Sequence, residues 1–329
     1  MWKKIAAIIL PTIIAAALIC FILYRVWDDL ILSLQYIVPT WLLLAIAVCL
    51  IAWLIRGTRY KFILKRLDTN VNVPFSTACI YISQTANIIL PARLGDFVRM
   101  FILKHEKKTP YTNSFTSLIA ERVYDILIIA LLGLISLPFL ISIIPAEYKW
   151  FNWLIIGVLI AGVIGIIVLV LARFLHAENK IIKKILEIFA QFRTVSSSVV
   201  SLGYLSGISV VIWIMDVIVC WLVSMMFNVE IPFMLILLAI VIGNLVKAVP
   251  ITPGGIGTYE LALVVVFQIG GVTAASATLI AVIDHLIKNG VTLIGGIISM
   301  YYFGGWSVEL MKKLFKADKK SLKEDNGNI

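Results

Sequence analysis

Long runs of apolar residues are the feature that most restricts how this chain can fold. A membrane-spanning helix needs about 20 mainly apolar residues to cross a hydrocarbon core about 30 Å thick. Such runs recur along the 329 residues, of which 61% are hydrophobic and only 14% are charged. Because a soluble protein of this length could not bury so much apolar surface, we expect an all-α membrane protein with about eight transmembrane helices. They are expected at residues 5–23, 40–55, 113–144, 150–172, 203–227, 232–248, 256–271 and 274–303.

The stretch at residues 75–90 is apolar but carries several polar side chains, and Pro91 ends it. It is either a ninth crossing or a re-entrant helix that enters the membrane and turns back. The positions of Lys and Arg favour the re-entrant helix, because cytoplasmic loops collect these residues. With the N terminus inside, the basic loops then all lie in the cytoplasm, at residues 56–66, 93–108, 173–193 and 312–323. We therefore predict a multi-pass protein of the inner (cytoplasmic) cell membrane with both termini cytoplasmic.

Two further segments are expected on the cytoplasmic side. In residues 179–192 the apolar side chains gather on one side of a helix and three lysines lie near the other. This pattern is typical of a helix lying in the membrane interface. We divide the chain into a polytopic transmembrane domain at residues 1–304 and a polar cytoplasmic tail at residues 305–329.

Metal and cofactor sites are not expected. The four cysteines lie in apolar runs, and the three histidines have no spacing that suits a metal ion. No Walker loop, nucleophile elbow or dinucleotide fingerprint occurs. Basic cytoplasmic loops account for the formal net charge of +10, so nucleic acid is not an expected partner. We predict a protein without cofactor, metal or enzymatic activity.

Two segments with proline and glycine are expected to interrupt helices inside the membrane. Residues 91–95 and 253–257 share the pattern Pro-x-x-aliphatic-Gly, each with an asparagine upstream and an acidic residue downstream. Broken backbone at membrane depth is tolerated only where protein or a water-filled cavity surrounds it. Paired broken segments in two halves of a chain are typical of a transporter's binding site. The alternative is two unrelated kinks, because proline and glycine are common in membrane helices.

Charged residues within the predicted spans also indicate a polar site. Each costs about 3 kcal/mol or more at the bilayer centre unless it is paired or hydrated. Asp284 and Lys288 can pair along one helix face, and Glu121 and Asp125 share another. The alternative, for Arg93, Asp96, Arg99, Glu121 and Arg122, is a solvated position at the cytoplasmic interface. The candidate residues for binding a lipid or its headgroup are Asn87, Pro91, Arg93, Gly95, Asp96, Arg99, Glu121, Arg122, Asp125, Asp216, Asn244, Lys247, Pro253, Gly254, Gly255, Gly257, Glu260, Asp284 and Lys288.

These residue types suit an anionic headgroup. The N–H groups at the start of a broken helix favour negative charge, and guanidinium groups bind phosphate in bidentate fashion. Glycines at 254, 255 and 257 allow the backbone to approach a ligand closely. We predict that a lipid phosphate passes through the site, with Arg93 as its central contact, while the tails stay in the bilayer. If transport is coupled to protons, Asp216 or Glu260 is the expected carrier.

At these residues the chain resembles the flippase-like family named after the transmembrane region of lysylphosphatidylglycerol synthase. The resemblance covers nearly the whole chain and depends on Arg56 with Arg59, residues 87–99, Glu121–Arg122 with Asp125, and residues 253–257 with Glu260. It implies paired re-entrant segments and an integral membrane protein that moves a charged or polyprenyl-linked lipid between leaflets. The sequence lacks the soluble aminoacyl-transferase domain of the full synthase, so lysyl transfer from tRNA is not expected.

Members of this family also occur near glycosyltransferases and glycan-assembly proteins. The resemblance therefore implies a phospholipid or a polyprenyl-phosphate (glyco)lipid as substrate, and a glycosyltransferase or lipid-modifying enzyme as a further partner. Two rival functions stay open. One is an intramembrane enzyme acting on a lipid phosphate or glycosyl donor, with Glu121 and Asp125 as acid and base. The other is a membrane partner that anchors a glycosyltransferase.

Overall fold

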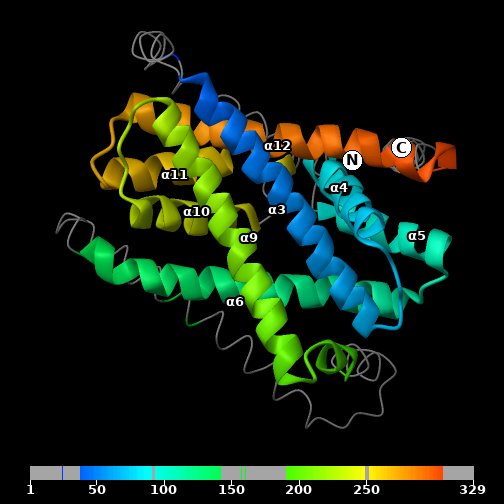
Figure 1. Cartoon of the computed structure of the whole chain (residues 1–329). Helices are drawn as coiled ribbons and strands as arrows, with labels where there is room; N and C mark the ends of the chain where they lie inside the picture. The colour runs from blue at the N-terminus through cyan, green and yellow to red at the C-terminus, as the bar shows by residue number, and fades with distance from the viewer. Residues whose placement is uncertain are drawn as a thin grey trace, which may run out of the picture.

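The computed structural model is built of α-helices, as expected for an all-α membrane protein (Figure 1). It describes residues 38–90, 93–141, 190–248 and 252–306, together with Tyr24, Gly157 and Ile160, and these ranges contain no strand. The helices are α3 (Pro39–Arg66), α4 (Val73–Ile89), α5 (Gly95–Lys107), α6 (Tyr111–Ile141), α9 (Val199–Met226), α10 (Phe233–Ala248), the short 3-10 helix η4 (Pro253–Gly255), α11 (Thr258–Ile269) and α12 (Ala274–Phe303).

Several sequence predictions fall wholly or mostly outside the described residues. These are the spans at 5–23 and 150–172, most of the interfacial helix at 179–192, and the polar tail beyond residue 306. Among the described helices, α3, α9 and α12 are long and apolar enough to cross a membrane. The count of eight spans therefore stays a prediction.

The ends of the long helices follow local sequence signals. α3 starts at Pro39, where a proline loses no hydrogen bond. The side chains of Ser198 and Thr273 cap α9 and α12 by accepting a backbone N–H three residues further on. The spans expected at 203–227 and 274–303 are therefore confirmed to within four residues.

The helices form two sets with the same order. α3, α4, α5 and α6 contain 28, 17, 13 and 31 residues, whereas α9, α10, α11 and α12 contain 28, 16, 12 and 30. Each set has a long helix, two short helices and a second long helix. The matching lengths identify two structural repeats, which we call the first repeat (α3–α6) and the second repeat (α9–α12).

The two repeats run in opposite directions, because α3 and α9 lie antiparallel (Figure 1). At one end the N–H of Val38 donates to the carbonyl of Met226 at 3.1 Å. At the other end Arg66 donates to the hydroxyl of Ser198 at 3.4 Å. Since α4 follows the end of α3 and α10 follows the end of α9, the two pairs of short helices start from opposite ends of the molecule. This inverted topology is common among secondary transporters.

Each pair of short helices is a hairpin. Lys107, at the end of α5, lies over the ring of Phe75 near the start of α4, with Nζ 5.1 Å from the ring centroid. Gly270, which follows α11, lies against Leu235 near the start of α10. This hairpin agrees with the re-entrant helix expected at residues 75–90, and its position relative to the membrane stays a prediction.

The tips of the two hairpins meet. A Cβ on Gly254 would lie 3.3 Å from the Cα of Ile88, near the end of α4. Hairpins that enter from opposite ends and touch at their tips cannot both cross the molecule. At 1.5 Å per residue α10 and α11 reach only about 24 and 18 Å, less than a core about 30 Å thick. Residues 232–248 and 256–271, which were expected as two separate crossings, instead form the arms of the second hairpin, and the number of spans stays a prediction.

Gly95 allows α5 to turn back tightly against α4. A Cβ at this position would lie 2.3 Å from the carbonyl oxygen of Ser83 and 2.5 Å from the backbone nitrogen of Asn87. Backbone atoms cannot rotate away, so Gly95→Ala is expected to lower the free energy of unfolding by about 1–3 kcal/mol. The measurement is the melting temperature in detergent. Gly203→Ala in α9 is the matched control, because a Cβ there meets no atom within 4 Å. An unchanged melting temperature of Gly95→Ala would show that the hairpin has room to open.

Candidate functional site

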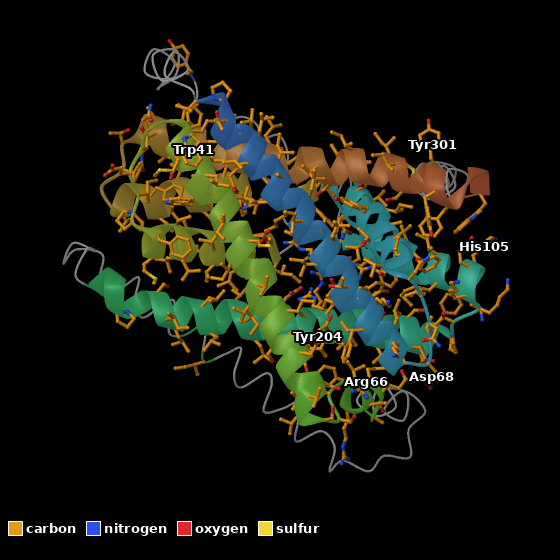
Figure 2. The ribbon with its side chains drawn as sticks, viewed as in Figure 1. Trp41, Arg66, Asp68, His105, Tyr204 and Tyr301 are labelled. Carbon is orange, nitrogen blue, oxygen red and sulfur yellow. The ribbon has the colours of Figure 1, made fainter. Side chains whose placement is uncertain are left out.

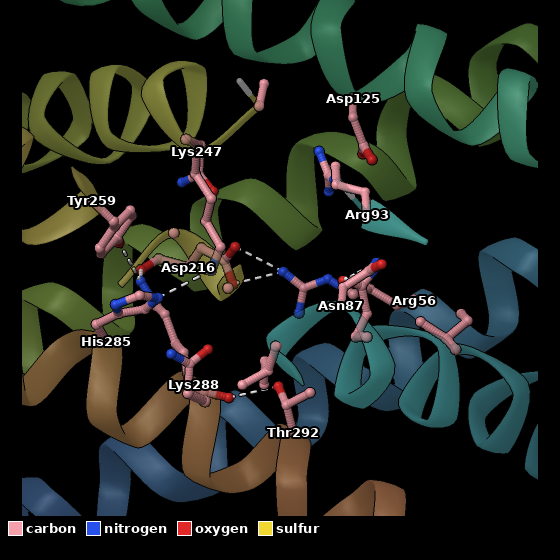
Figure 3. A pocket seen from close by; sticks show the side chains of 18 of the residues that line it. Arg56, Asn87, Arg93, Asp125, Asp216, Lys247, Tyr259, His285, Lys288 and Thr292 are labelled. Atoms are coloured by element: carbon pink, nitrogen blue, oxygen red, sulfur yellow. Dashed lines mark hydrogen bonds and ion pairs between the residues drawn. The ribbon is translucent and has the colours of Figure 1, made fainter. Parts of the chain in front are cut away.

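A cavity of about 410 Å³ lies between the two repeats where the hairpin tips meet, and Ile88 and Gly254 both line it (Figure 3). Its lining also comes from α3, α6, α9 and α12, so both repeats build it. The predicted site residues that line this cavity are Asn87, Arg93, Glu121, Arg122, Asp125, Asp216, Asn244, Lys247, Gly254, Gly255 and Lys288.

Other predicted residues lie behind the lining or build the tips. Asp96 accepts a hydrogen bond from Asn87 at 2.9 Å and pairs with Arg122 at 3.0 Å. Pro253 begins η4, and Gly257 precedes α11 with a φ of 85°, a conformation that favours glycine. Pro91 lies outside the described residues.

The charged residues of the first repeat form a buried network. Glu121 pairs with Arg59 at 3.1 Å and also with Arg99. Arg59 pairs in addition with Asp125 at 2.6 Å. Arg59 and Arg99 are 1% and 0% exposed, and guanidinium groups so deeply buried need carboxylate partners. The alternative that Arg99 and Glu121 are solvated interface residues is therefore wrong.

The second repeat holds a network of Asp284, Lys288 and Tyr259. Lys288 pairs with Asp284 at 2.8 Å, which confirms the pairing expected from their spacing. Asp284 also accepts a hydrogen bond from the hydroxyl of Tyr259 at 2.8 Å. Lys288 reaches α9 as well, because its Nζ donates to the carbonyl of Asp216 at 3.1 Å. This network fixes Lys288 at the wall of the cavity.

Glu260, His285 and Lys247 form a hydrogen-bonded chain that ends in the cavity. One oxygen of Glu260 accepts the N–H of Gly257 at 2.7 Å, which caps α11. The other oxygen lies 2.7 Å from Nδ1 of His285. Nε2 of His285 lies 3.1 Å from Nζ of Lys247. Glu260 thus orients Lys247 through the imidazole ring.

Arg56 and Asp216 join the two repeats. Nη2 of Arg56 lies 2.8 and 2.7 Å from the two oxygens of Asp216 (Figure 3). Arg56 is the eighteenth residue of α3, which starts at residue 39, and Asp216 is the eighteenth residue of α9, which starts at residue 199. Equivalent positions of two inverted repeats meet only at the axis that relates the repeats. The pair therefore marks this axis.

Two cations of the cavity have no acidic partner within the described ranges. Arg93 makes no hydrogen bond or ion pair with any described residue, and Lys247 contacts His285 and, at 5.5 Å, the ring of Tyr259. They come from opposite hairpins, because Arg93 follows the tip of the first hairpin and Lys247 precedes the tip of the second.

The acidic residues that line the cavity are already engaged. They are Glu121, Asp125 and Asp216, and each pairs with Arg56, Arg59 or Arg99. Arg93 also has a φ of 58°, which is unusual for a residue other than glycine and is found at binding sites. The described part of the cavity thus presents two cations that form no direct ion pair with a carboxylate.

Arg56 and Arg59 were missed because the sequence predicts a cytoplasmic loop at residues 56–66. That prediction is wrong, since α3 continues to Arg66 and carries both side chains inside the protein. Their spacing of three residues, without a proline or a turn signal before residue 67, is the pattern that could have indicated a helix face.

His285 was also missed, because a lone histidine within a span suggested no ligand set. Only the fold brings it between Glu260 and Lys247. Among the described residues, no group of three or more His, Cys, Asp or Glu side chains is placed to hold a metal ion.

Comparison with known proteins identifies the family. A profile of the lysylphosphatidylglycerol synthase TM region matches residues 8–296. The chain belongs to this family. The resemblance found in its broken segments and buried charges is thus confirmed, and the chain is a multi-pass membrane protein.

Named relatives come from archaea. The chain is 30% identical to Glycosyltransferase AglD of Haloferax volcanii, over 90% of this chain and 54% of that protein. It is 24% identical to a UPF0104 membrane protein of Methanothermobacter thermautotrophicus, over 89% of this chain and 93% of the relative. It is also 24% identical to the UPF0104 membrane protein PH1989 of Pyrococcus horikoshii, over 78% and 85%. This chain therefore spans only about half the length of the Haloferax relative.

Proposed function

We propose that this chain is a flippase-type lipid transporter that moves a lipid with an anionic headgroup between leaflets. The observation that carries the proposal is the pair of cations, Arg93 and Lys247, which face one cavity without an acidic partner among the described residues. Both side chains are partly buried, and a cation withdrawn from water is costly unless an anion or water neutralises it. A lipid phosphate supplies the charge and the acceptor oxygens that both side chains need.

The architecture supports movement of the ligand. The cavity lies where two hairpins from inverted repeats meet, which is where secondary transporters bind substrate and coupling ions. In this proposal Arg93 and Lys247 contact the phosphate, Asn87 and Asn244 supply neutral polar contacts, and Gly254 and Gly255 let the backbone come close. The other candidate residues hold these groups in place.

We propose transport rather than catalysis. The rival enzyme needs Glu121 and Asp125 as acid and base, but both carboxylates pair with Arg59. Carboxylates held by a guanidinium group in this way already have a partner and are not free to contact a substrate. Turnover of a lipid phosphate by the pure protein in detergent would contradict this part of the proposal.

The proposed orientation places the ends of α3, α5 and α12 in the cytoplasm, at the cell membrane. Arg66 and His105 mark this end in Figure 2, and Lys65, Lys104 and Lys107 lie near them in sequence. The described loops of the opposite end, at residues 227–232 and 270–273, contain no Lys or Arg. Cytoplasmic loops are the ones that collect basic residues. Both termini are then cytoplasmic. Two crossings return the chain to the side from which it started, and one hairpin does the same, so the C terminus is on the same side in either case.

A second candidate function is that of a membrane partner of a glycosyltransferase. The Haloferax relative is named a glycosyltransferase, which favours this function. The match with this chain covers only 54% of that relative, which favours it too. The name of that relative also favours a polyprenyl-phosphate lipid over a phospholipid as the substrate of this chain. As a partner without transport activity, the chain would tolerate replacement of Arg93.

Leaflet exchange of fluorescent phosphatidylglycerol and of a fluorescent polyprenyl phosphate in proteoliposomes tests the proposal. Arg93→Ala is expected to slow exchange at least tenfold, because a hydrogen bond to a charged group contributes about 1.5–3 kcal/mol and about 1.4 kcal/mol is a factor of ten. Arg93→Lys is expected to be intermediate, since lysine keeps the charge but not the planar fork. Arg193→Ala, at an exposed arginine outside the cavity, is the matched control and keeps the native rate.

Two outcomes would overturn the proposal. If folded native protein exchanges neither lipid, transport fails and the partner function is favoured. If Arg93→Ala exchanges lipid as fast as Arg193→Ala, the phosphate does not bind at the unpaired arginine.

A further inference from the structure

An apolar groove of about 280 Å³ lies between α5 and α6, beside the central cavity. Phe97, Phe115 and Ile126 line it and are 47%, 36% and 46% exposed, so it opens toward the outside of the helix bundle. Arg93, Arg122 and Ile126 line both the groove and the cavity. The two hollows therefore adjoin at two guanidinium groups.

The groove follows one face of α6. Its α6 residues recur every three or four positions, as neighbours on one helix face do. They are Phe115, Leu118, Ile119, Arg122, Val123 and Ile126. The eleven steps from the first residue to the last rise about 16 Å, which is about half of a hydrocarbon core about 30 Å thick. The groove therefore extends over about the depth of one leaflet, and the ion pair of Asp96 with Arg122 lies at its inner end.

We propose that this α5–α6 groove holds one hydrocarbon chain of the transported lipid while the lipid phosphate binds Arg93 in the cavity. The inference depends on the proposed function and adds the path of the tail. Six of the nine lining residues are apolar, and a polar or hydrated occupant would lose hydrogen bonds against them. Two of its three charged lining residues, Arg93 and Arg122, also line the cavity, where the headgroup would join the tail.

The position of α5 explains why a tail can enter here. α5 has 13 residues and belongs to a hairpin that ends inside the protein, so it covers only part of the length of α6. Exposed apolar side chains by themselves are ordinary in a membrane protein. The adjoining guanidinium groups distinguish this groove from the rest of the lipid-facing surface, because they couple tail contact to headgroup contact.

Photocrosslinking of the full chain in nanodiscs tests the coupling. Benzoylphenylalanine in place of Phe97 is expected to capture phosphatidylglycerol or a polyprenyl phosphate, and adding Arg93→Ala is expected to lower the yield at least fivefold. The same photoreactive residue in place of Leu131 is the control. Leu131 lies on α6 outside the groove and is also 47% exposed. It is expected to capture bulk lipid whether or not Arg93 is present. A yield at position 97 that ignores Arg93 would overturn the proposal and mark a bulk lipid contact only.

Filling the groove tests its role in transport. Val123→Trp is expected to slow leaflet exchange at least fivefold, with Leu131→Trp as the control at the native rate. If the native protein transports and a folded Val123→Trp variant does so equally fast, the groove is not the tail path and the proposed function stands. If the native protein does not transport, the proposed function itself fails. The photocrosslinking result still decides the groove if Val123→Trp does not fold.

Discussion

Replacing Glu121 with alanine is expected to lower the free energy of unfolding by about 3–5 kcal/mol, because it leaves the buried guanidinium group of Arg99 without a carboxylate partner. Glu121 pairs with both Arg59 and Arg99. Arg59 keeps Asp125, whereas Arg99 loses its only acidic partner among the described residues. The total free energy of unfolding of a protein is typically about 5–15 kcal/mol, so this loss is large. Little of the variant is expected to accumulate in the membrane.

The measurement is the amount of protein in the membrane fraction together with the melting temperature in detergent. Glu121→Gln keeps the shape of the side chain without its charge. Its melting temperature is expected to lie between those of the native protein and Glu121→Ala. Glu230→Ala removes an exposed carboxylate and is the matched control, with native stability. A native melting temperature of Glu121→Ala would show that water, not carboxylate, satisfies Arg99.

The long helices could be predicted from the sequence because their starts depend on local signals, but the basic loop expected at residues 93–108 is wrong, since α5 (Gly95–Lys107) is a helix. Apolar runs long enough to cross the membrane start at Pro39 and after the cap at Thr273, and both starts were expected within one residue. The first hairpin could also be predicted, because Pro91 and the basic residues that follow it require a return to the side of entry. The second hairpin could not, since α10 and α11 are apolar and no charge distinguishes a return from two crossings. Only contact between the tips decides this.

The site could be predicted only where its residues stand out in a span. Asp216, Glu260 and Lys288 do so, because a charge inside an apolar run is costly and needs a reason. Arg56 and Arg59 do not, because at the end of an apolar run they look like ordinary interface residues. Arg56 is partly buried, and its partner comes from a helix 160 residues further on. Such pairing is a property of the fold.

Removing one member of the pair at the repeat axis is expected to be the second most damaging change. Arg56→Ala or Asp216→Ala leaves a partly buried charge unpaired, which costs up to about 3–5 kcal/mol. The double alanine variant is expected to be more stable than either single variant, because no charge is left without a partner. Melting temperatures of all four proteins in detergent give the coupling between the residues. Leaflet exchange is expected to be at least tenfold slower in each single variant. Additive losses in the double variant would contradict a direct pair.

Exchanging the two charges distinguishes a simple contact from a pair fixed in direction. If only attraction between positions 56 and 216 mattered, Arg56→Asp combined with Asp216→Arg would restore stability. The surroundings of the two positions differ, however, because Lys288 donates to the carbonyl of Asp216 at 3.1 Å. An arginine at position 216 would face this lysine, so the exchanged protein is expected to melt below the double alanine variant. Recovery of the native melting temperature would show that positions 56 and 216 can hold either charge equally well. The expected failure would mean that the two repeats share a backbone plan but carry different charges, so one repeat binds the anion differently from the other.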